Sequence, residues 1–281
     1  MRDAWLAGLA LVALAATPAG ADEWSHRYPV KGAPDLHVKA DDGSVRIEIG
    51  AASEIDAGVT TEGWRIAPGE VTITESQTGD RIDLEVRIPR EHHGFGTGHR
   101  SITVVLRVPK QADLDVHTGD GSIEAQPVSG RLSLSTGDGS ITAEGLQGEI
   151  HLHSGDGSIR ARGLTGRLEA DTGDGHLDVR GRFDILNLHT GDGGIEAAVE
   201  PGSRLESEWS LRSGDGGITL RLPEGLGADL DAHTGDGGIV LEKPVTVAGT
   251  IREHAVRGKL GPGGLPLKIH TGDGSIRLLG L

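Results

Sequence analysis

Apolar and polar residues alternate along much of this chain, and the alternation recurs every 18 residues. Stepping through the chain at that spacing gives two apolar rows: Leu114, Leu132, Ile150, Leu168 and Leu186, then Val116, Leu134, Leu152, Ala170 and Leu188. Residues between these rows are charged or polar. Alternation of period 2 is typical of β-strands with one buried face. The fixed spacing indicates a repeat architecture.

Each period contains Thr-Gly-Asp-Gly or Ser-Gly-Asp-Gly, which joins one alternating segment to the next. Eight copies occur, with central aspartates Asp120, Asp138, Asp156, Asp174, Asp192, Asp215, Asp236 and Asp273. The spacings between them are 18, 18, 18, 18, 23, 21 and 37 residues. We expect the extra residues to lie in corners. We expect the longest interval to hold about two coils, one of them degenerate.

Eighteen residues suit two short strands and two tight turns. The sequence therefore predicts an all-β protein, a right-handed parallel β-helix or β-solenoid whose coils lie about 4.8 Å apart. Residues 111–281 are expected to form the solenoid, with the motif glycines permitting positive φ angles at its corners. An antiparallel meander fits the strand lengths, but it would not place each motif over the last. A propeller blade needs roughly 40–50 residues.

Residues 22–110 alternate without the strict repeat and are expected to form a less regular β segment continuous with the solenoid. Strands are predicted at residues 37–40, 44–49, 71–74, 82–88 and 102–108. The sequence Asp41-Asp42-Gly43 between the first two reads as a diverged copy of the motif.

Residues 1–21 have the pattern of a secretory signal peptide. Arg2 precedes an apolar run, and Ala19-Gly20-Ala21 supplies a small-x-small cleavage site. The apolar run is shorter than the ~20 residues that span a bilayer, and no later stretch is apolar enough. We therefore expect an exported chain beginning at Asp22, in the periplasm or at the cell surface, without a transmembrane segment.

Composition narrows the possible partners and chemistry. The formal net charge of -15 disfavours nucleic acid and anionic membranes as partners. Glycine is abundant, at 46 residues, and aromatic residues make up only 2%, so the core must be thin. The absence of cysteine excludes disulfides, thiolate metal sites and cysteine catalysis.

Several segments together resemble the bacterial "putative adhesin" family of β-strand-repeat proteins of unknown function. Residues 40–47 are similar to its opening strand, and residues 104–109 with 114–121 to its middle. The serial Gly-Asp-Gly copies and residues 263–276 are similar to the rest. The resemblance covers nearly the whole exported chain. It implies a relation to autotransporter adhesin heads, hence a right-handed β-helix at the cell envelope, with no enzymatic activity and no site residues.

The stacked aspartates require an explanation, because adjacent carboxylates about 4.8 Å apart repel each other by about 0.9 kcal/mol in water. In one explanation each carboxylate accepts backbone N–H bonds within its own turn. In the other, Ca²⁺ bridges coils through the candidate metal ligands Asp120, Asp138, Asp156, Asp174 and Asp192. The chain has one acidic corner per coil, which departs from the nonapeptide calcium repeat. No other cofactor is expected.

Catalysis is not expected. Paired carboxylates could suit glycoside hydrolysis, but an active site needs two carboxylates in different environments, and the repeat offers near-identical ones. Histidines such as His117, His153 and His189 recur at alternate coils, about 9.6 Å apart, too far to share a metal ion. Trp209, beside an insertion, could contact a sugar or cover an end or edge of the solenoid.

The sequence thus predicts a non-catalytic exported scaffold, adhesive or structural, whose partner is an envelope or surface protein or glycan. The alternatives are a solenoid stabilised by Ca²⁺ along the aspartate row, and an envelope polysaccharide-active enzyme.

Overall fold

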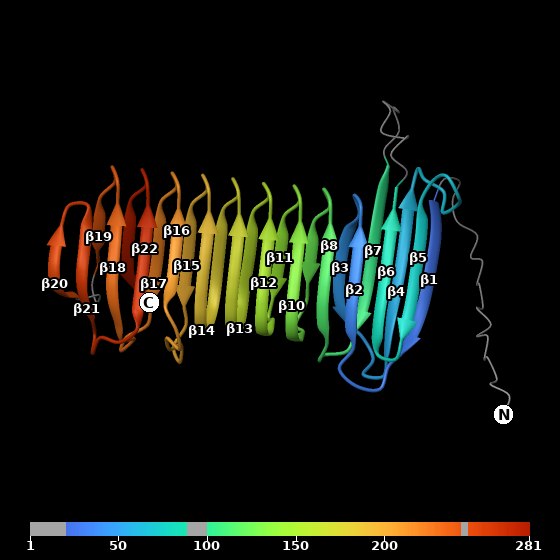
Figure 1. Ribbon diagram of the computed structural model, residues 1–281, viewed down its shortest axis with the longest axis horizontal. Coiled ribbons are helices and arrows are strands. Elements are labelled where there is room, and N and C mark those ends of the chain that lie inside the picture. The colour runs from blue at the N-terminus through green and yellow to red at the C-terminus, as the bar shows by residue number, and fades with distance from the viewer. Residues whose placement is uncertain (1–20, 89–99, 243–246) are drawn as a thin grey trace.

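The computed structural model describes residues 21–88, 100–242 and 247–281. These residues form an elongated, solenoid-like all-β array of 23 strands, without a helix among them (Figure 1). The predicted signal peptide lies outside the described residues except for Ala21, where the first strand begins.

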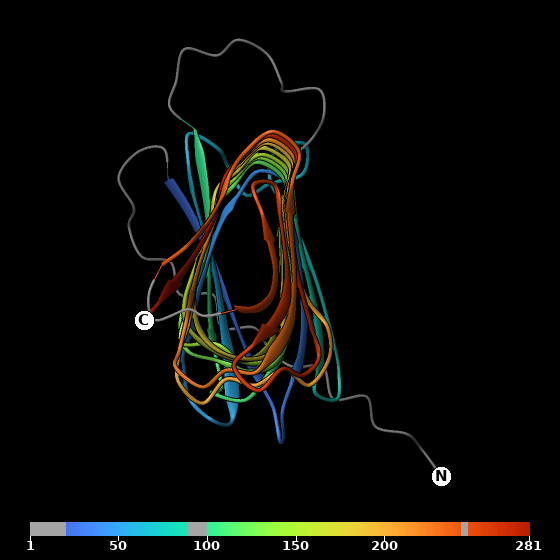
Figure 2. The ribbon, with the colours of Figure 1, turned by 90° about the vertical axis from the view of Figure 1, so that its left-hand side faces the viewer.

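The strands form two long sides that face each other across a narrow interior (Figure 2). We call these sides sheet A and sheet B. In spatial order, sheet A contains β5 (Thr72–Thr78), β6 (Arg81–Arg87), β2 (Asp35–Ala40), β8 (Asp113–Thr118), β10 (Ser129–Thr136), β12 (Gln147–Ser154), the later parts of β13 (Ile159–Thr172) and β14 (Leu177–Thr190), β16 (Trp209–Ser213), β22 (Pro266–Thr271), β18 (Ala228–Thr234), β21 (Ala255–Leu260) and β20 (Val247–Arg252).

Sheet B contains β1 (Ala21–Pro29), β4 (Glu54–Glu62), β7 (Ser101–Val108), β3 (Ser44–Ile49), β9 (Ile123–Ala125), β11 (Ile141–Glu144), the earlier parts of β13 and β14, β15 (Ile195–Val199), β17 (Ile218–Leu222), β23 (Ile276–Gly280) and β19 (Ile239–Leu241). Because β13 and β14 run through both sides, the two sheets are continuous. The predicted strands of the N-terminal segment are all present, whereas β1 and β4 were not predicted.

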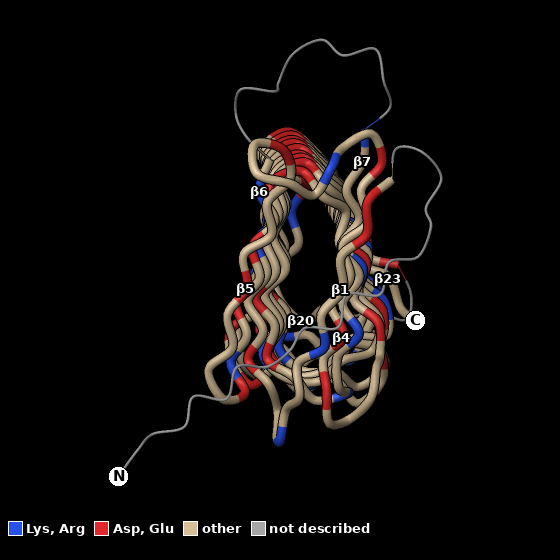
Figure 3. Tube along the Cα trace, turned by 90° about the vertical axis from the view of Figure 1, so that its right-hand side faces the viewer, with Lys and Arg blue, Asp and Glu red and all other residues tan. Residues whose placement is uncertain are grey.

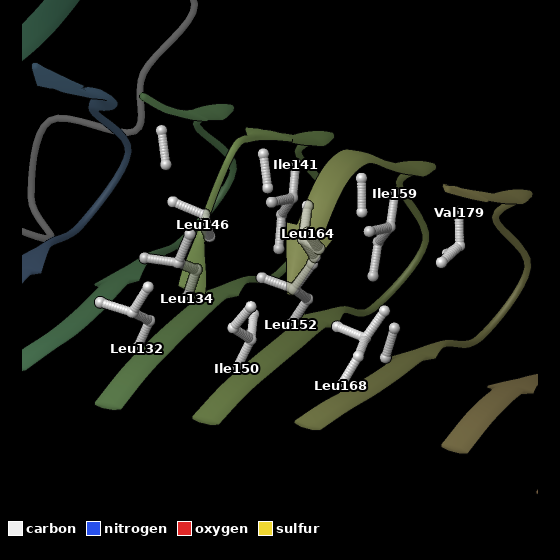
Figure 4. Packing of buried hydrophobic residues seen from close by; sticks show 14 of the residues in the cluster. Leu132, Leu134, Ile141, Leu146, Ile150, Leu152, Ile159, Leu164, Leu168 and Val179 are labelled. Carbon is white, nitrogen blue, oxygen red and sulfur yellow. The ribbon is translucent and has the colours of Figure 1, made fainter. Parts of the chain in front are cut away.

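The apolar rows point inward and fill the space between the two sheets (Figure 4). Leu132, Ile150 and Leu168 lie side by side on adjacent parallel strands and are at most 1% exposed. Ile141 and Ile159 face them from sheet B and are fully buried. The predicted inward rows are confirmed, and small aliphatic side chains explain how a narrow interior is filled with few aromatic residues.

The Gly-Asp-Gly corners stack directly on one another through hydrogen bonds between coils. The N–H of Gly155 donates to the carbonyl of Gly137 at 2.6 Å. The hydroxyl of Ser154, buried before the motif, donates to the carbonyl of Gly139 at 2.8 Å. The same pair of bonds recurs at the other full copies, so the Thr or Ser side chain bonds coil to coil from within the core.

Close approach of the backbones, and not positive φ, explains the motif glycines. A Cβ on Gly157 would lie 2.0 Å from the carbonyl oxygen of Gly139. Among the described residues, every positive φ belongs to a glycine outside the motif, such as Gly163 (66°) in the second corner. The expectation of positive φ at the motif was therefore wrong, because the coil spacing leaves no room for a side chain there.

The coils at both ends do not stack in sequence order. The last coil, β22 with β23, lies between the two coils that precede it, so Leu267 is paired with both Trp209 and Leu230 (Figure 1). At the other end β2 lies between β6 and β8. The prediction that the 37-residue interval holds a degenerate coil was wrong, because the segment folds outward as the antiparallel hairpin β20–β21.

That hairpin covers the C-terminal end of the stack. It pairs antiparallel with β18, and His254 at its turn lies with Nδ1 2.7 Å from the carbonyl oxygen of Gly237. In inner coils this carbonyl position accepts a Thr or Ser hydroxyl from the next coil, as Gly139 does. His254 thus replaces the missing next coil.

The N-terminal end is closed by a contact between the two sheets. Tyr28 of β1 donates a hydrogen bond to the carboxylate of Glu75 on β5, and His26 lies 3.2 Å from the same carboxylate. Burial, then the hydrogen bond and the charge of Glu75, raises the pKa of the Tyr28 phenol. This neutral phenol links the first strands of the opposite sheets.

Trp209 lies inside the solenoid and is fully buried, with Nε1 donating to the carbonyl of Asp184 at 3.1 Å. It begins β16, directly after the inserted residues of the 23-residue interval. Both expected roles for Trp209 were wrong, since a buried indole can neither contact a sugar nor cover an end.

Candidate binding face and the aspartate corner

The outer surface of sheet A carries most of the chain's histidines. Two columns of outward residues cross its strands, at the positions of Asp115 and His117 in each coil, and we call this surface the histidine face. Seven of the 13 histidines of the chain lie in these columns: His37, His117, His151, His153, His189, His233 and His270.

Three shallow hollows follow one another along the histidine face, with volumes of about 470, 640 and 460 Å³. The largest spans β10 to β16, and its lining includes Ser135, His153, Asp171 and Arg212. Because the columns continue from coil to coil, an extended molecule along the solenoid axis would meet a polar or charged side chain at ~4.8 Å intervals.

Histidines in these columns are paired with carboxylates of neighbouring coils. His151 Nδ1 lies 3.1 Å from the carboxylate of Glu169, and His153 Nδ1 lies 3.1 Å from that of Asp171. At the margin of the face, the backbone N–H of Arg131 and then its guanidinium lower the pKa of Asp113.

The outer surface of sheet B is different, because its charges neutralise one another. Arginines of one coil bind carboxylates of a neighbour: Arg46 with Glu124 at 3.1 Å, Arg107 with Glu48 at 3.2 Å, Arg162 with Asp178 at 2.7 Å, Arg180 with Glu200 at 2.9 Å, and Arg221 with Glu196. Exposed pairs of this kind contribute little stability. On the histidine face, by contrast, the side chains of His117, His189 and Arg212 form no hydrogen bond or ion pair with the described residues.

The motif aspartates line one corner of the solenoid, where acidic residues gather (Figure 3). In spatial order they are Asp120, Asp138, Asp156, Asp174, Asp192, Asp215, Asp273 and Asp236, all exposed. Asp42 of the diverged copy aligns with Asp120. Within the described part of the chain, the aspartate side chains of the eight full copies form no hydrogen bond or ion pair. The explanation by N–H bonds within each turn was therefore wrong.

The structure brings the five calcium candidates Asp120, Asp138, Asp156, Asp174 and Asp192 onto adjacent coils of this corner, as the spacing predicted. Among residues 21–88, 100–242 and 247–281, no three histidine, aspartate or glutamate side chains converge as ligands of one metal ion. Calcium binding stays a prediction. The described residues also contain no helix long and apolar enough to span a membrane.

The histidine face was not predicted from the sequence, because it becomes visible only when the columns through Asp115 and His117 are considered together. The signal was present: His151-Leu152-His153 is followed 18 residues later by Glu169-Ala170-Asp171. In an 18-residue coil this spacing places each carboxylate beside a histidine.

No curated protein matches the chain. Solved structures that this chain matches include a "putative adhesin" of Bacteroides fragilis, 14% identical, covering 92% of this chain and 97% of the other with a TM-score of 0.47. A "putative lipid binding protein" of Parabacteroides distasonis is 11% identical, with the same coverages and a TM-score of 0.49. A "putative adhesin" of Parabacteroides merdae is 13% identical, covering 92% and 96%, with a TM-score of 0.42. A family model matches residues 34–279, and the chain belongs to the Toastrack DUF4097 family.

Proposed function

We propose that this protein is an exported, non-catalytic β-solenoid scaffold that presents the histidine face to an extended partner in the cell envelope. The observation that carries the proposal is the contrast between the two outer surfaces. Sheet A has consecutive hollows lined by serine, histidine and carboxylate groups, whereas the arginines of sheet B are engaged by neighbouring carboxylates. Interfaces need polar groups that are free to bind a partner.

The other parts of this proposal come from the sequence. The signal-like residues 1–21 support export to the periplasm or cell surface, and the partner is an envelope or surface protein or glycan. A right-handed parallel coil, related to autotransporter adhesin heads, stays part of the proposal.

A matched pair of bulky substitutions tests this function. Ser135 on the histidine face and Thr142 on the outer surface of sheet B are both half-buried and lie in the same coil. Binding of the chain from Asp22 onward to immobilised envelope glycans and proteins is expected to fall with Ser135→Trp and to persist with Thr142→Trp. Equal losses in the two variants, or no binding by the unmodified chain, would contradict the proposal.

The aspartate corner supports a second candidate, a solenoid stabilised by Ca²⁺. The aspartates of the eight full copies have no partner among the described residues, and oxygen ligands are those that Ca²⁺ prefers. If this candidate holds, a calcium chelator lowers the melting temperature markedly, and added Ca²⁺ restores it while equal ionic strength of NaCl does not. An unchanged melting temperature would exclude it.

A further inference from the structure

We propose that the outer surface of β12 binds a divalent ion of the zinc class, through His151 and Glu149 with His153 as the second nitrogen ligand. Imidazole and carboxylate are ligands that Zn²⁺ takes in proteins. This site lies on the histidine face, away from the aspartate corner, and its occupancy does not depend on the proposed envelope partner.

The strand itself brings the three side chains to one surface. Glu149, His151 and His153 occupy alternate positions of β12, and the residues between them, Ile150 and Leu152, are buried. Because side chains alternate across a strand, the three ligands share the outer face. The apolar residues fix the strand against the core, so the ligands project from a rigid element.

Glu149 and His151 already stand at a separation suited to one metal ion. Glu149 Oε1 lies 3.5 Å from His151 Nε2. Tetrahedral zinc holds nitrogen at about 2.0–2.1 Å and carboxylate oxygen at about 2.0–2.2 Å, so two such ligand atoms lie about 3.4 Å apart. An ion can therefore enter between these atoms with little movement of either side chain.

Carboxylates of the next coil orient both imidazoles. His151 Nδ1 lies 3.1 Å from Glu169 Oε2, and His153 Nδ1 lies 3.1 Å from Asp171 Oδ1. When each Nδ1–H donates to its carboxylate, each Nε2 carries a lone pair. A carboxylate that holds the second ring nitrogen is the usual support of a metal-binding histidine.

The site is open, and carboxylates outnumber the cations next to it. His151 lines two adjoining hollows, of about 640 and 460 Å³, which leave room for water ligands. Arg167 lies 3.8 Å from Glu149 and opposes a bound cation, while Glu149, Glu169 and Asp171 favour one. Glu149 and His151 are in place, and His153 joins by rotation about its side-chain bonds, which exchanges its contact with Asp171 for the ion.

The experiment is a zinc titration of the chain from Asp22 onward, purified without a histidine tag and followed by calorimetry. The expected result is one zinc ion per chain, with His151→Gln abolishing binding and His153→Gln or Glu149→Gln weakening it. Glu169→Gln, which removes only the orienting carboxylate, is expected to weaken binding about 10-fold or more. The visible spectrum of bound Co²⁺ reports whether nitrogen ligands surround the ion.

His189 provides the matched control. It lies in the same column as His153, but the residues two positions away along the chain are Asn187 and Gly191, neither of which is a zinc ligand. His189→Gln is expected to bind zinc as the unmodified chain does. No stoichiometric binding, or an equal loss in His189→Gln and His151→Gln, would overturn the proposal. Melting curves without zinc establish that each variant is folded.

Discussion

The contact between motif backbones can be tested at Gly193 and Gly194, two neighbouring glycines in one corner. A Cβ on Gly193 would lie 1.9 Å from the carbonyl oxygen of Gly175. A Cβ on Gly194 would lie no closer than 3.2 Å to its nearest neighbour, a ring nitrogen of His176. The position of Gly194 also carries a side chain in other coils, such as Ser158. Gly193→Ala should therefore be much more damaging than Gly194→Ala.

The loss in the free energy of unfolding caused by Gly193→Ala can be estimated from the hydrogen bonds between coils that must lengthen. Normal contact requires the coils to separate by about 1 Å, which weakens two bonds between coils: Gly191 N–H to the carbonyl of Gly173 at 2.6 Å, and Thr190 Oγ1 to that of Gly175 at 2.9 Å. At about 1 kcal/mol each, with about 1–3 kcal/mol for the disturbed packing, the free energy of unfolding falls by about 3–5 kcal/mol.

Urea denaturation followed by circular dichroism measures this difference, with amide exchange of the neighbouring coils as a second readout, because solenoids can open coil by coil. Gly194→Ala is expected to change the free energy of unfolding by less than about 1 kcal/mol. Equal costs for the two variants, or a Gly193→Ala cost below about 1 kcal/mol, would refute the account of the motif.

Two further predictions concern charge and pH. Since the pKa of Tyr28 is raised in the folded chain, its contribution to stability is present below the ordinary value of about 10 and is lost as the pH rises above it. Tyr28→Phe should reduce the loss of stability between neutral and strongly alkaline pH in urea titrations; an unchanged alkaline profile would contradict this. Asp156→Asn removes two adjacent repulsions of at most about 0.9 kcal/mol each in water, so it should raise the melting temperature at low salt and less at high salt. A lower melting temperature that depends on Ca²⁺ would instead show Asp156 to be a ligand.

The regular part of the fold follows directly from the sequence, whereas the order of the coils at its ends does not. The rows through Leu132 and Ile141 fix which residues point inward, because strand alternation and the 18-residue period leave one register for each coil. Those rows are nearly alike in every coil. These rows therefore do not indicate beside which coil the last one pairs, and its place between β16 and β18 becomes clear only from the structure.

The contacts of several individual side chains were also not predicted from the sequence. In the sequence, His254 resembles an ordinary surface histidine. Its contact with the carbonyl of Gly237 arises only because no further coil follows there to supply a Thr or Ser hydroxyl. Trp209 stands four residues before Ser213, as Leu186 stands four residues before Thr190, so it continues an inward row. The longer 23-residue interval hides this match in the sequence. The calcium candidates were placed correctly on one corner, but their lack of hydrogen bonds could not be seen from residue types.

Histidine-selective labelling with diethyl pyrocarbonate tests the central claim most directly, namely that the histidine face is the binding surface. Mass spectrometry of the chain, with and without its bound envelope partner, gives the modification of each histidine. We predict that binding protects His117, His153 and His189, and leaves His176, exposed beside the aspartate corner, fully modified. Protection of His176 alone, or equal modification of all four with the partner bound, would contradict the account.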